Sequence, residues 1–463
     1  MLREMRDNLL KDLVLDVGDK VLESPEETST FMNGFFKSKV TKLLEQLTPS
    51  VEDAVEYMEE YLEGRKVGDF SFQPISFDQT MFIIKSLKNT NSLGRDGIGV
   101  KVVKLFRDVL APALQFIINL SIKKNIFPSR WKFGQVIPLP KKGNLREPKN
   151  WRPINLLPIC SKTLEMAMNY QFKSHLESWE LFSPSQHAYR DFRGTVTAWT
   201  EIDTIIREAA ERGWSSIIAT TDLSAAFNTL DKKIMIPMLR RIGMTEDSAR
   251  LMASYLSGRK TVVKVGEATS EAIDLDTGVG EGSIQGPICF ISILIPVPVV
   301  AKRTNRRLAK LGIMAKVHTV EFADDCSGII TGETEFACQI ATTIMMEEFN
   351  VFYNTVGLKQ NMDKSEILPV RRCKKTFDIS VGDVVETDCI KLLGLTVQSG
   401  LRFERHVENM AKSVRQRIHE IYKLQHKMNF TLLKNTVESL CLSKIYYCME
   451  IYNNTKEISV AIQ

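Results

Sequence analysis

Three aspartates stand where short apolar runs of the sequence end. Asp324 and Asp325 are adjacent within "VEFADDCSGII", and Asp222 follows the run "IIA" about a hundred residues earlier. A lone aspartate at a strand end is more often a helix cap or a turn former than a ligand. Adjacent carboxylates need more explanation, because they repel each other and raise each other's pKa unless a cation lies between them. The pair therefore favours a metal site.

The chemistry of such a site is phosphoryl transfer. Carboxylate oxygens are hard ligands that select Mg²⁺ or Mn²⁺ rather than zinc. Two such ions, about 4 Å apart, can align an attacking hydroxyl with a phosphate and stabilise the leaving oxygen. We therefore predict that Asp222, Asp324 and Asp325 share two Mg²⁺ ions, with Mn²⁺ as the alternative ion.

Strands and turns must position these acids. The run before Asp222 predicts a strand, followed by a turn and an amphipathic helix over residues 231–242. The β-prone runs "AKVHTVEF" and "CSGIIT" are joined through Ala323, Asp324 and Asp325, which predicts a hairpin with the carboxylates at its tip. Between the helix over residues 231–242 and this hairpin, "KTVVKVG" and "SEAIDLDTGV" predict two strands, and "GVGEGSIQGP" predicts a glycine-rich turn.

The first part of the chain is largely helical. Ser24 can cap a helix that has Pro25 at its first position and Glu27 three residues on, and the helix extends to about Leu47. Further helices are expected over residues 78–87, 101–126 and 161–179, with a loop over 89–99. The segment "GQVIPLPKKGNLREPKNWRPINLL" predicts a strand, a basic loop and a second strand. Within residues 101–126, apolar residues at helical spacing indicate a buried helix: Val102, Leu105, Phe106, Val109, Leu110, Ala113, Leu114 and Ile117.

Bulk properties narrow the class of protein. At 463 residues the chain can form two or three domains, and its net charge of +5 suits a polyanionic partner without requiring one. Its eight cysteines are scattered without zinc-site spacing, so we expect reduced thiols in an intracellular protein. The N-terminus has no signal-peptide pattern. The apolar run over residues 286–301 contains Pro296 and Pro298 and is predicted to be core, not a membrane span.

Several segments, in one order from about residue 18 to 430, resemble the reverse transcriptases of non-LTR (LINE-type) retrotransposons of the jockey and CR1 kind. They are "DVGDKVLESPEETSTFMNGFFKSKV", "NSLGRDGI", "PLPKKGNLREPKNWRPINLLPICSKTLE", "SQHAYRDFRGTVTA", "TTDLSAAFNTLD", "GVGEGSIQGPICF", "EFADDCSGI", "GLKQNMDKSEIL" and "IKLLGLTVQSGLRFERHV". One Ala-Asp-Asp triplet would be a weak signal. The ordered set is a strong one.

The resemblance implies an α+β right-hand polymerase with an antiparallel palm sheet packed on helices. We expect a helical lead-in over residues 1–65, fingers over 66–210, a palm over 211–400 and an incomplete helical thumb over 401–463. The basic helical pattern from Leu401 onward would follow a phosphate backbone. The implied activity is RNA-directed DNA polymerisation in the cytoplasm and nucleus, with an RNA template, a DNA primer or target and dNTPs as partners and no membrane.

The resemblance also assigns residue roles. Asp222, Asp324 and Asp325 would be the catalytic, metal-binding carboxylates, and the Phe227 ring would exclude a 2′-hydroxyl. The other implied substrate-binding residues are Lys142 or Lys141 and Arg152 at the triphosphate, Gly282 and Ser283 at a close backbone approach, and Lys364 as the acid that protonates pyrophosphate.

Departures from the family pattern keep alternatives open. Glu281 stands where a glutamine is common, and Asn228 where an aspartate is common. Pro296 and Pro298 fall where the family has a helix, so we expect a break near Ile295. The chain lacks an upstream endonuclease and a zinc knuckle, as expected of a fragment of a mobile element. An inactive remnant that binds nucleic acid is one alternative, and an RNA-templated RNA polymerase, disfavoured by Phe227, is another.

Overall fold

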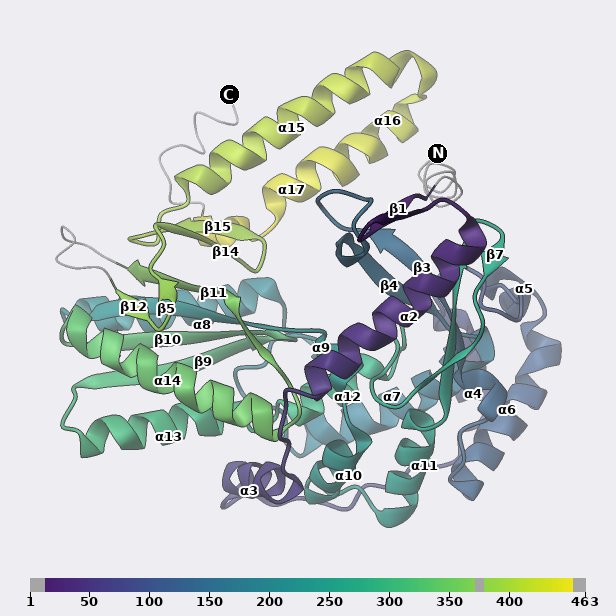
Figure 1. Cartoon of the computed structure of the whole chain (residues 1–463), viewed down its shortest axis with the longest axis horizontal. Helices are drawn as coiled ribbons and strands as arrows, with labels where there is room; N and C mark the ends of the chain where they lie inside the picture. Colours follow the sequence, from purple (N-terminus) through teal and green to yellow (C-terminus); the bar gives the residue numbers. More distant parts are fainter. Residues whose placement is uncertain (1–12, 371–378, 453–463) are drawn as a thin grey trace. The chain divides into compact units, whose positions relative to one another are not determined.

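The computed structural model describes residues 13–370 and 379–452 (Figure 1). The chain divides into two compact units. Unit 1 comprises Met1–Ser183, Ser224–Pro296 and Val351–Lys359, and unit 2 comprises Pro184–Leu223, Val297–Asn350 and Gln360–Gln463. The division does not test the predicted boundaries of fingers, palm and thumb, which stay a prediction.

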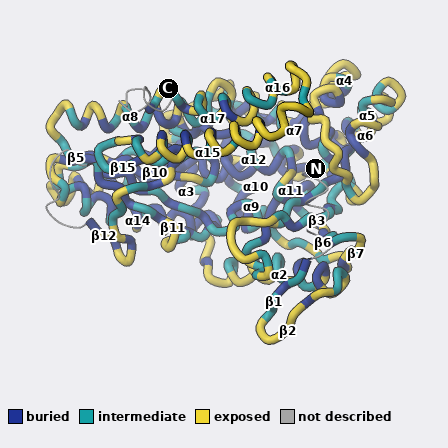
Figure 2. Tube along the Cα trace, turned by 90° about the horizontal axis from the view of Figure 1, so that it is seen from above, coloured by how far each residue is buried: buried dark blue, intermediate teal, exposed yellow. Residues whose placement is uncertain are grey.

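Unit 2 is built on a four-stranded antiparallel sheet. Its strand order is β11-β5-β10-β9, with β11 Gln360–Val370, β5 Ser215–Leu223, β10 Asp325–Gly332 and β9 Ala315–Phe322. The two inner strands, β5 and β10, are mostly buried (Figure 2). The sheet joins segments that are far apart in the sequence, so residues at its strand ends can meet.

Helices cover both faces of this sheet. Helix α8 (Thr195–Glu211) packs Trp199 and Ile202 into a core cluster with Ile329 of β10. Helix α14 (Glu335–Thr355) lies on the opposite face, where a side chain at Gly328 would meet Met345. Because side chains alternate along a strand, consecutive residues of β10 serve the two faces.

The remaining elements of unit 2 are short hairpins and helices. Helix α13 (Val297–Lys310) contacts β9. The others are the hairpins β12 (Ser380–Val381) with β13 (Val384–Val385) and β14 (Cys389–Leu392) with β15 (Leu395–Gln398), then α15 (Glu404–Leu424), η3 (Gln425–Lys427), α16 (Phe430–Val437), the π-helix η4 (Glu438–Leu442), α17 (Ser443–Tyr446) and α18 (Met449–Tyr452).

Unit 1 contains a second sheet, of order β4-β3-β6-β7, with β8 also pairing with β6. Strand β3 pairs antiparallel with β4 and parallel with β6. Val136, Trp151 and Val263 contribute to its buried core cluster, and helix α2 packs along β6. The strands of this sheet are β3 (Phe133–Pro140), β4 (Trp151–Leu156), β6 (Arg259–Val265), β7 (Ala268–Thr269) and β8 (Ile273–Leu275), while β1 (Leu15–Val17) and β2 (Lys20–Leu22) pair with each other in a separate two-stranded sheet.

Helices make up the rest of unit 1. They are α2 (Pro25–Leu44), α3 (Val51–Leu62), α4 (Phe77–Ser86), α5 (Val100–Leu105), α6 (Arg107–Lys124), η1 (Ser129–Lys132), η2 (Pro148–Asn150), α7 (Ile159–Ser178), α9 (Ala226–Thr229), α10 (Lys232–Arg241), α11 (Glu246–Leu256) and α12 (Gly286–Ile293). The prediction of a mixed helix and sheet protein with antiparallel pairing is therefore confirmed. So is the cap of α2, where the Ser24 side chain accepts a hydrogen bond from the Glu27 backbone.

One predicted helix is partly wrong. Residues 101–126 form two helices, α5 and α6, that meet at Phe106. Several side chains of the predicted buried stripe are exposed, namely Val102, Leu105, Phe106, Val109 and Ile117. Leu114 of the predicted stripe is buried, and the other buried side chains are Val103, Ala111, Ile118 and Ile122. Apolar residues lie around most of this segment, so periodicity alone could not select the face that contacts α4 and α7.

The break predicted near Ile295 is confirmed. Helix α12 ends at Ile293 and α13 begins at Val297, with Pro296 between them. By length and composition, Gly286–Lys310 is apolar enough to cross a membrane, and 78% of its most apolar window is buried in the protein. That burial agrees with the predicted core segment.

Candidate active site

The three predicted catalytic aspartates lie at one end of the sheet in unit 2. Phe322 pairs with Asp325, so Ala323 and Asp324 form a two-residue turn and Asp325 opens β10. On the other side of β10, Cys326 pairs with Thr221. One step further in this register, Asp222 faces Asp325 across the two strands, where Cβ atoms are typically about 5 Å apart.

The electrostatics of Asp325 show that the carboxylates converge. Burial, followed by the charges of Asp324 and Asp222, raises the pKa of Asp325 to about 6. Burial and the charge of Asp324 also raise the pKa of Tyr189. Negative charge thus accumulates at this strand end, as the sequence predicted, and a cation would relieve it.

Lys364 places a positive charge next to one of the aspartates. Its Nζ lies 3.1 Å from Oδ2 of Asp222, and Nδ2 of Asn361 donates to the same oxygen at 3.4 Å. Asn361 pairs with Asp222 across β11 and β5, and the register then shifts before Glu366. The irregular stretch holds Lys364, so a β-bulge re-aims the lysine toward the acid.

The donor chemistry suits a hard divalent cation, since all three side chains are carboxylates. Among the residues that the structure describes, however, no group of three or more His, Cys, Asp and Glu side chains is arranged to hold a metal ion. The three aspartates lie near one another, but their side chains are not arranged as a set of metal ligands. The Lys364 ammonium lies beside one of them.

The predicted triphosphate contacts belong to unit 1. Arg152 on β4 is exposed, and its Nε lies 3.9 Å from Oε2 of Glu281. Asn228 Nδ2 donates to the other carboxylate oxygen of Glu281 at 3.3 Å. The two departures from the family pattern therefore contact each other. Lys141 and Lys142 are exposed in the loop after β3.

The glycine-rich turn around Glu281 is packed against Asn155. Gly282 has a φ of 113°, and a Cβ there would lie 2.6 Å from the Asn155 carbonyl oxygen. The Asn155 backbone N–H donates to the Glu281 carbonyl at 2.8 Å. A close backbone approach thus does require Gly282, and the group that approaches within unit 1 is Asn155. Ser283 is buried, and its Oγ accepts from the Gly286 N–H at the start of α12.

Phe227 has a defined packing partner. Its ring stacks on Phe290 of α12, with centroids 5.0 Å apart and planes at 30°. Phe290 is fully buried, whereas Phe227 is half-buried. One face of the Phe227 ring is therefore fixed by the core.

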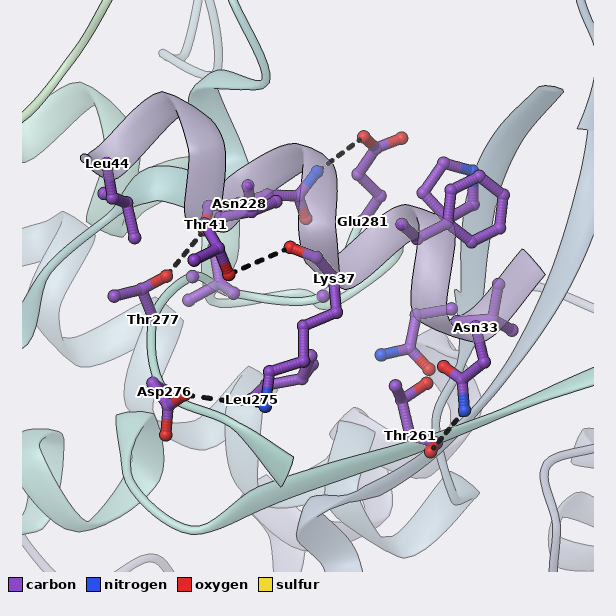
Figure 3. Close-up of a pocket in the computed structure, with 18 residues that line it drawn as sticks. Asn33, Lys37, Thr41, Leu44, Asn228, Thr261, Leu275, Asp276, Thr277 and Glu281 are labelled. Atoms are coloured by element: carbon purple, nitrogen blue, oxygen red, sulfur yellow. Dashed lines mark hydrogen bonds and ion pairs between the residues drawn. The ribbon is translucent and has the colours of Figure 1, made fainter. Parts of the chain in front are cut away.

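A cavity of about 100 Å³ lies beside this turn, between α2 and the residues that follow β8 (Figure 3). Its lining includes Asn33 and Lys37 from α2, together with Asn228 and Glu281. Asn155 also lines it, and its Oδ1 atom is buried without a hydrogen-bond partner among the described residues.

Comparison with known proteins agrees with this geometry. Residues 139–397 match the family described as "Reverse transcriptase (RNA-dependent DNA polymerase)". The chain belongs to this family. The resemblance stated from the sequence motifs is thereby confirmed, and divalent metal ions are generally used by reverse transcriptases.

Relatives of this chain come from non-LTR retrotransposons. The chain is 20% identical over 439 residues to the RNA-directed DNA polymerase from mobile element jockey of Drosophila melanogaster, covering 93% of this chain and 46% of the relative. It is 24% identical over 389 residues to the probable RNA-directed DNA polymerase from transposon X-element of the same species, covering 82% and 41%. It is 23% identical over 301 residues to the retrovirus-related Pol polyprotein from type-1 retrotransposable element R2 of Popillia japonica, covering 65% and 40%. The chain thus spans less than half the length of these relatives.

Sequence reasoning missed a buried carboxylate in this chain. Glu165 of α7 is fully buried, and its Oε2 accepts from the backbone N–H groups of Ile284 and Gln285 at 2.7 and 3.3 Å. Ser161 donates to its other oxygen at 2.8 Å. Glu165 therefore fixes the entry to α12. Its position among the mostly apolar buried residues of α7 is the signal for it in the sequence.

Proposed function

We propose that the chain is the polymerase part of a non-LTR retrotransposon protein, and that it extends a DNA 3′-hydroxyl with dNTPs along an RNA template. The observation that carries this proposal is the meeting of Asp222, Asp324 and Asp325 at one strand end in a chain of the reverse transcriptase family. Template, primer and nucleotide are polyanions, which suits the basic net charge of +5.

The three aspartates would hold Mg²⁺, with Mn²⁺ as the alternative. Bound Mg²⁺ supplies charge neutralisation and polarises the phosphate oxygens. Asp222 is oriented for this task by Asn361 and Lys364. The Lys364 Nζ lies beside the acid cluster, 3.1 Å from Asp222, which supports its proposed role as the donor to departing pyrophosphate.

The remaining roles concern the nucleotide. Arg152 and the Lys141–Lys142 pair provide exposed cations for the triphosphate, with Arg152 offering a forked guanidinium. Phe227, held by Phe290, would exclude a ribose 2′-hydroxyl and so select dNTPs. Gly282 and Ser283 would shape the turn beside the nucleotide.

Primer extension tests the proposal. The wild-type chain should incorporate dNTPs on an RNA template when Mg²⁺ is present. Asp222→Asn and Asp325→Asn should each lower the rate by more than about 100-fold, because each removes a preorganised charge. Asp203→Asn, on the outer helix α8 in an ion pair with Arg207, is the matched control and should keep the wild-type rate. Full activity in Asp222→Asn would contradict the proposal.

A second candidate is a nucleic-acid-binding remnant without polymerase activity. The contact of Glu281 with Arg152 favours it, because the carboxylate both pairs the guanidinium and adds negative charge near the triphosphate. Tight binding of a primer–template duplex without incorporation, with activity gained on Glu281→Gln, would identify the remnant.

A further inference from the structure

The segment that carries the motif "SQHAYR" lies beside the end of β9 in unit 2, where Gln186 forms an isolated bridge with Glu321. The Glu321 backbone N–H donates to the Ser185 carbonyl at 2.9 Å, and the His187 N–H donates to the Glu321 carbonyl at 2.8 Å. This segment is therefore attached to the strand that leads directly into the aspartate turn.

Gln186 reaches from this segment to the turn itself. Its Oε1 accepts from the Ala323 N–H and from the Ala188 N–H, each at 3.0 Å. Its Nε2 donates to Oε2 of Glu321 at 3.4 Å, which orients the amide oxygen toward the turn. Gln186 is only 1% exposed, so water cannot replace these contacts.

The turn needs such support. Ala323 has a φ of 58°, a left-handed conformation that costs an L-residue other than glycine free energy. Its buried N–H must also find an acceptor. Oε1 of Gln186 accepts this N–H, and the hydrogen bond offsets part of the cost of the left-handed conformation. The next two residues of the chain are Asp324 and Asp325.

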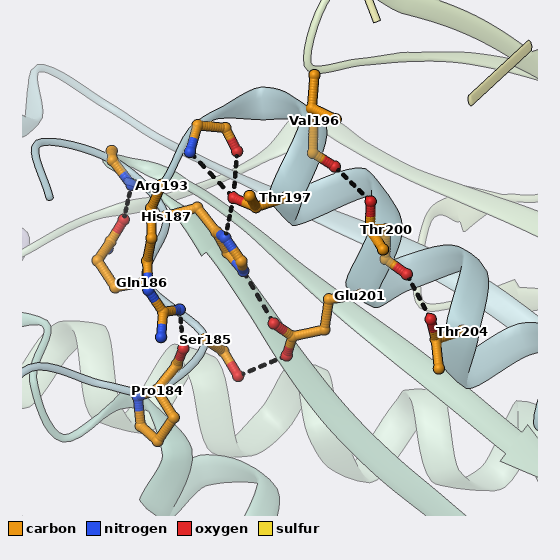
Figure 4. Close-up of polar contacts among 12 residues, drawn as sticks. Pro184, Ser185, Gln186, His187, Arg193, Val196, Thr197, Thr200, Glu201 and Thr204 are labelled. Carbon is orange, nitrogen blue, oxygen red and sulfur yellow. Dashed lines mark hydrogen bonds and ion pairs between the residues drawn. The ribbon is translucent and has the colours of Figure 1, made fainter. Parts of the chain in front are cut away.

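A second set of contacts fixes the segment to helix α8. His187 is buried, with Nε2 2.8 Å from Oε2 of Glu201 and Nδ1 2.7 Å from Oγ1 of Thr197. Ser185 donates to the other Glu201 oxygen at 2.9 Å. Figure 4 shows His187 and Ser185 directed toward Thr197 and Glu201 of helix α8. The residues on both sides of Gln186 are thus fixed to α8, so the position of Gln186 does not depend on the turn.

We propose that Gln186 is a positioning residue that holds Ala323 in its left-handed conformation, so that the turn directs Asp324 and Asp325 toward Asp222. The inference rests on the proposed polymerase function for its catalytic consequence. The structural consequence stands separately, since it concerns only the conformation of the turn.

The test compares Gln186→Met, which keeps the length of the side chain and loses the acceptor, with Asn305→Leu. Asn305 makes an equivalent pair of amide contacts to Val317 at the far end of β9, at 2.8 and 2.9 Å. Amide hydrogen exchange is read on the peptide that covers residues 320–327, and primer extension gives kcat and the KM for dNTP.

Gln186→Met should speed exchange in the turn by about tenfold and lower kcat by at least about tenfold, with the KM for dNTP within about twofold of wild type. Asn305→Leu should change neither turn exchange nor kcat. Adding Ala323→Gly to Gln186→Met should recover part of kcat, because glycine adopts the left-handed conformation without cost. The same addition to Asn305→Leu should give no such recovery.

Unchanged turn exchange in Gln186→Met, or equal effects of Asn305→Leu, would overturn the proposal. If Gln186→Met alone does not fold, turn exchange is compared between the double variant with Ala323→Gly and Ala323→Gly alone, and equal protection of the turn in these two proteins would overturn the proposal. If the wild-type chain incorporates no dNTP, the polymerase proposal fails while the exchange comparison still decides the role of Gln186.

Discussion

At the scale of residues, an acidic and a basic side chain lie next to each other at the proposed nucleotide site. Glu281 accepts from Asn228 and pairs with Arg152, whose side chain is 61% exposed. An exposed ion pair of this kind contributes little to stability. Its main effect is therefore on the potential that an incoming triphosphate meets.

Glu281→Gln should lower the KM for dNTP by about fivefold. The change removes one negative charge, worth about 1 kcal/mol at 4 Å in water. Steady-state primer extension measures it, with Glu267→Gln as the control, because Glu267 is 88% exposed beside Lys264. An unchanged KM would show that Glu281 does not act on the nucleotide.

Asp325→Asn should stabilise the protein at pH 8 in metal-free buffer. The folded chain binds the Asp325 proton more tightly than the unfolded chain, because burial and two neighbouring charges raise its pKa to about 6. Its contribution to stability is therefore lost as the pH rises from the ordinary aspartate range to about 6, and it stays lost above that.

Solvent screens part of this repulsion, so we expect a gain of about 1 kcal/mol or less at pH 8 and none at pH 4. Thermal unfolding at the two pH values measures it. Added Mg²⁺ should raise the melting temperature of the wild type more than that of Asp325→Asn. Equal stability of the two proteins at pH 8 would contradict the expected repulsion.

At the scale of elements, two glycines differ in whether the packing around them leaves room for a side chain. Gly34 is exposed within α2, and a Cβ there would meet nothing within 4 Å. Gly328 lies within β10, where a Cβ would come within 2.1 Å of the Met345 sulfur. The same substitution should therefore have opposite effects at the two positions.

Gly34→Ala should raise the free energy of unfolding by about 0.4–1 kcal/mol, because alanine loses less backbone entropy on folding into a helix. Gly328→Ala should lower it by about 1–3 kcal/mol, because Met345 must move. Urea unfolding measures both, and a stabilising Gly328→Ala would show that β10 and α14 are not packed as described.

The elements that carry the proposed catalytic acids could be predicted from the sequence. Local sequence patterns predicted the strand before Asp222 and the hairpin around Asp324. The order of the motifs along the chain indicated that these two segments belong to one site. The roles of Glu165 and Gln186 could not be predicted, because each depends on backbone N–H groups more than a hundred residues away, those of Ile284 and Gln285 for Glu165 and that of Ala323 for Gln186. The buried face of α5 and α6 was missed because both faces are apolar.

At the scale of the whole molecule, three histidines link stability to pH. Burial lowers the pKa of His175 in unit 1 and of His318 and His406 in unit 2. Each takes up its proton more readily in the unfolded chain, so stability is lost as the pH falls below the ordinary histidine range.

Unfolding in urea should therefore require less denaturant at pH 5 than at pH 7. His175→Gln should reduce this difference, because glutamine cannot take up a proton and can still donate to the Ile242 carbonyl that His175 contacts at 2.8 Å. His419→Gln, on an exposed turn of α15, is the control. An unaltered pH dependence in His175→Gln would exclude His175 as a source of it.

The contact of Lys364 with Asp222 has a practical consequence for handling the protein. A lysine already serves as an internal counterion for one of the acids, so chelators such as EDTA should strip the sample of divalent ions without unfolding it. Catalysis could then be started at a chosen moment by adding Mg²⁺ to a preassembled mixture, which makes single-turnover measurements practicable.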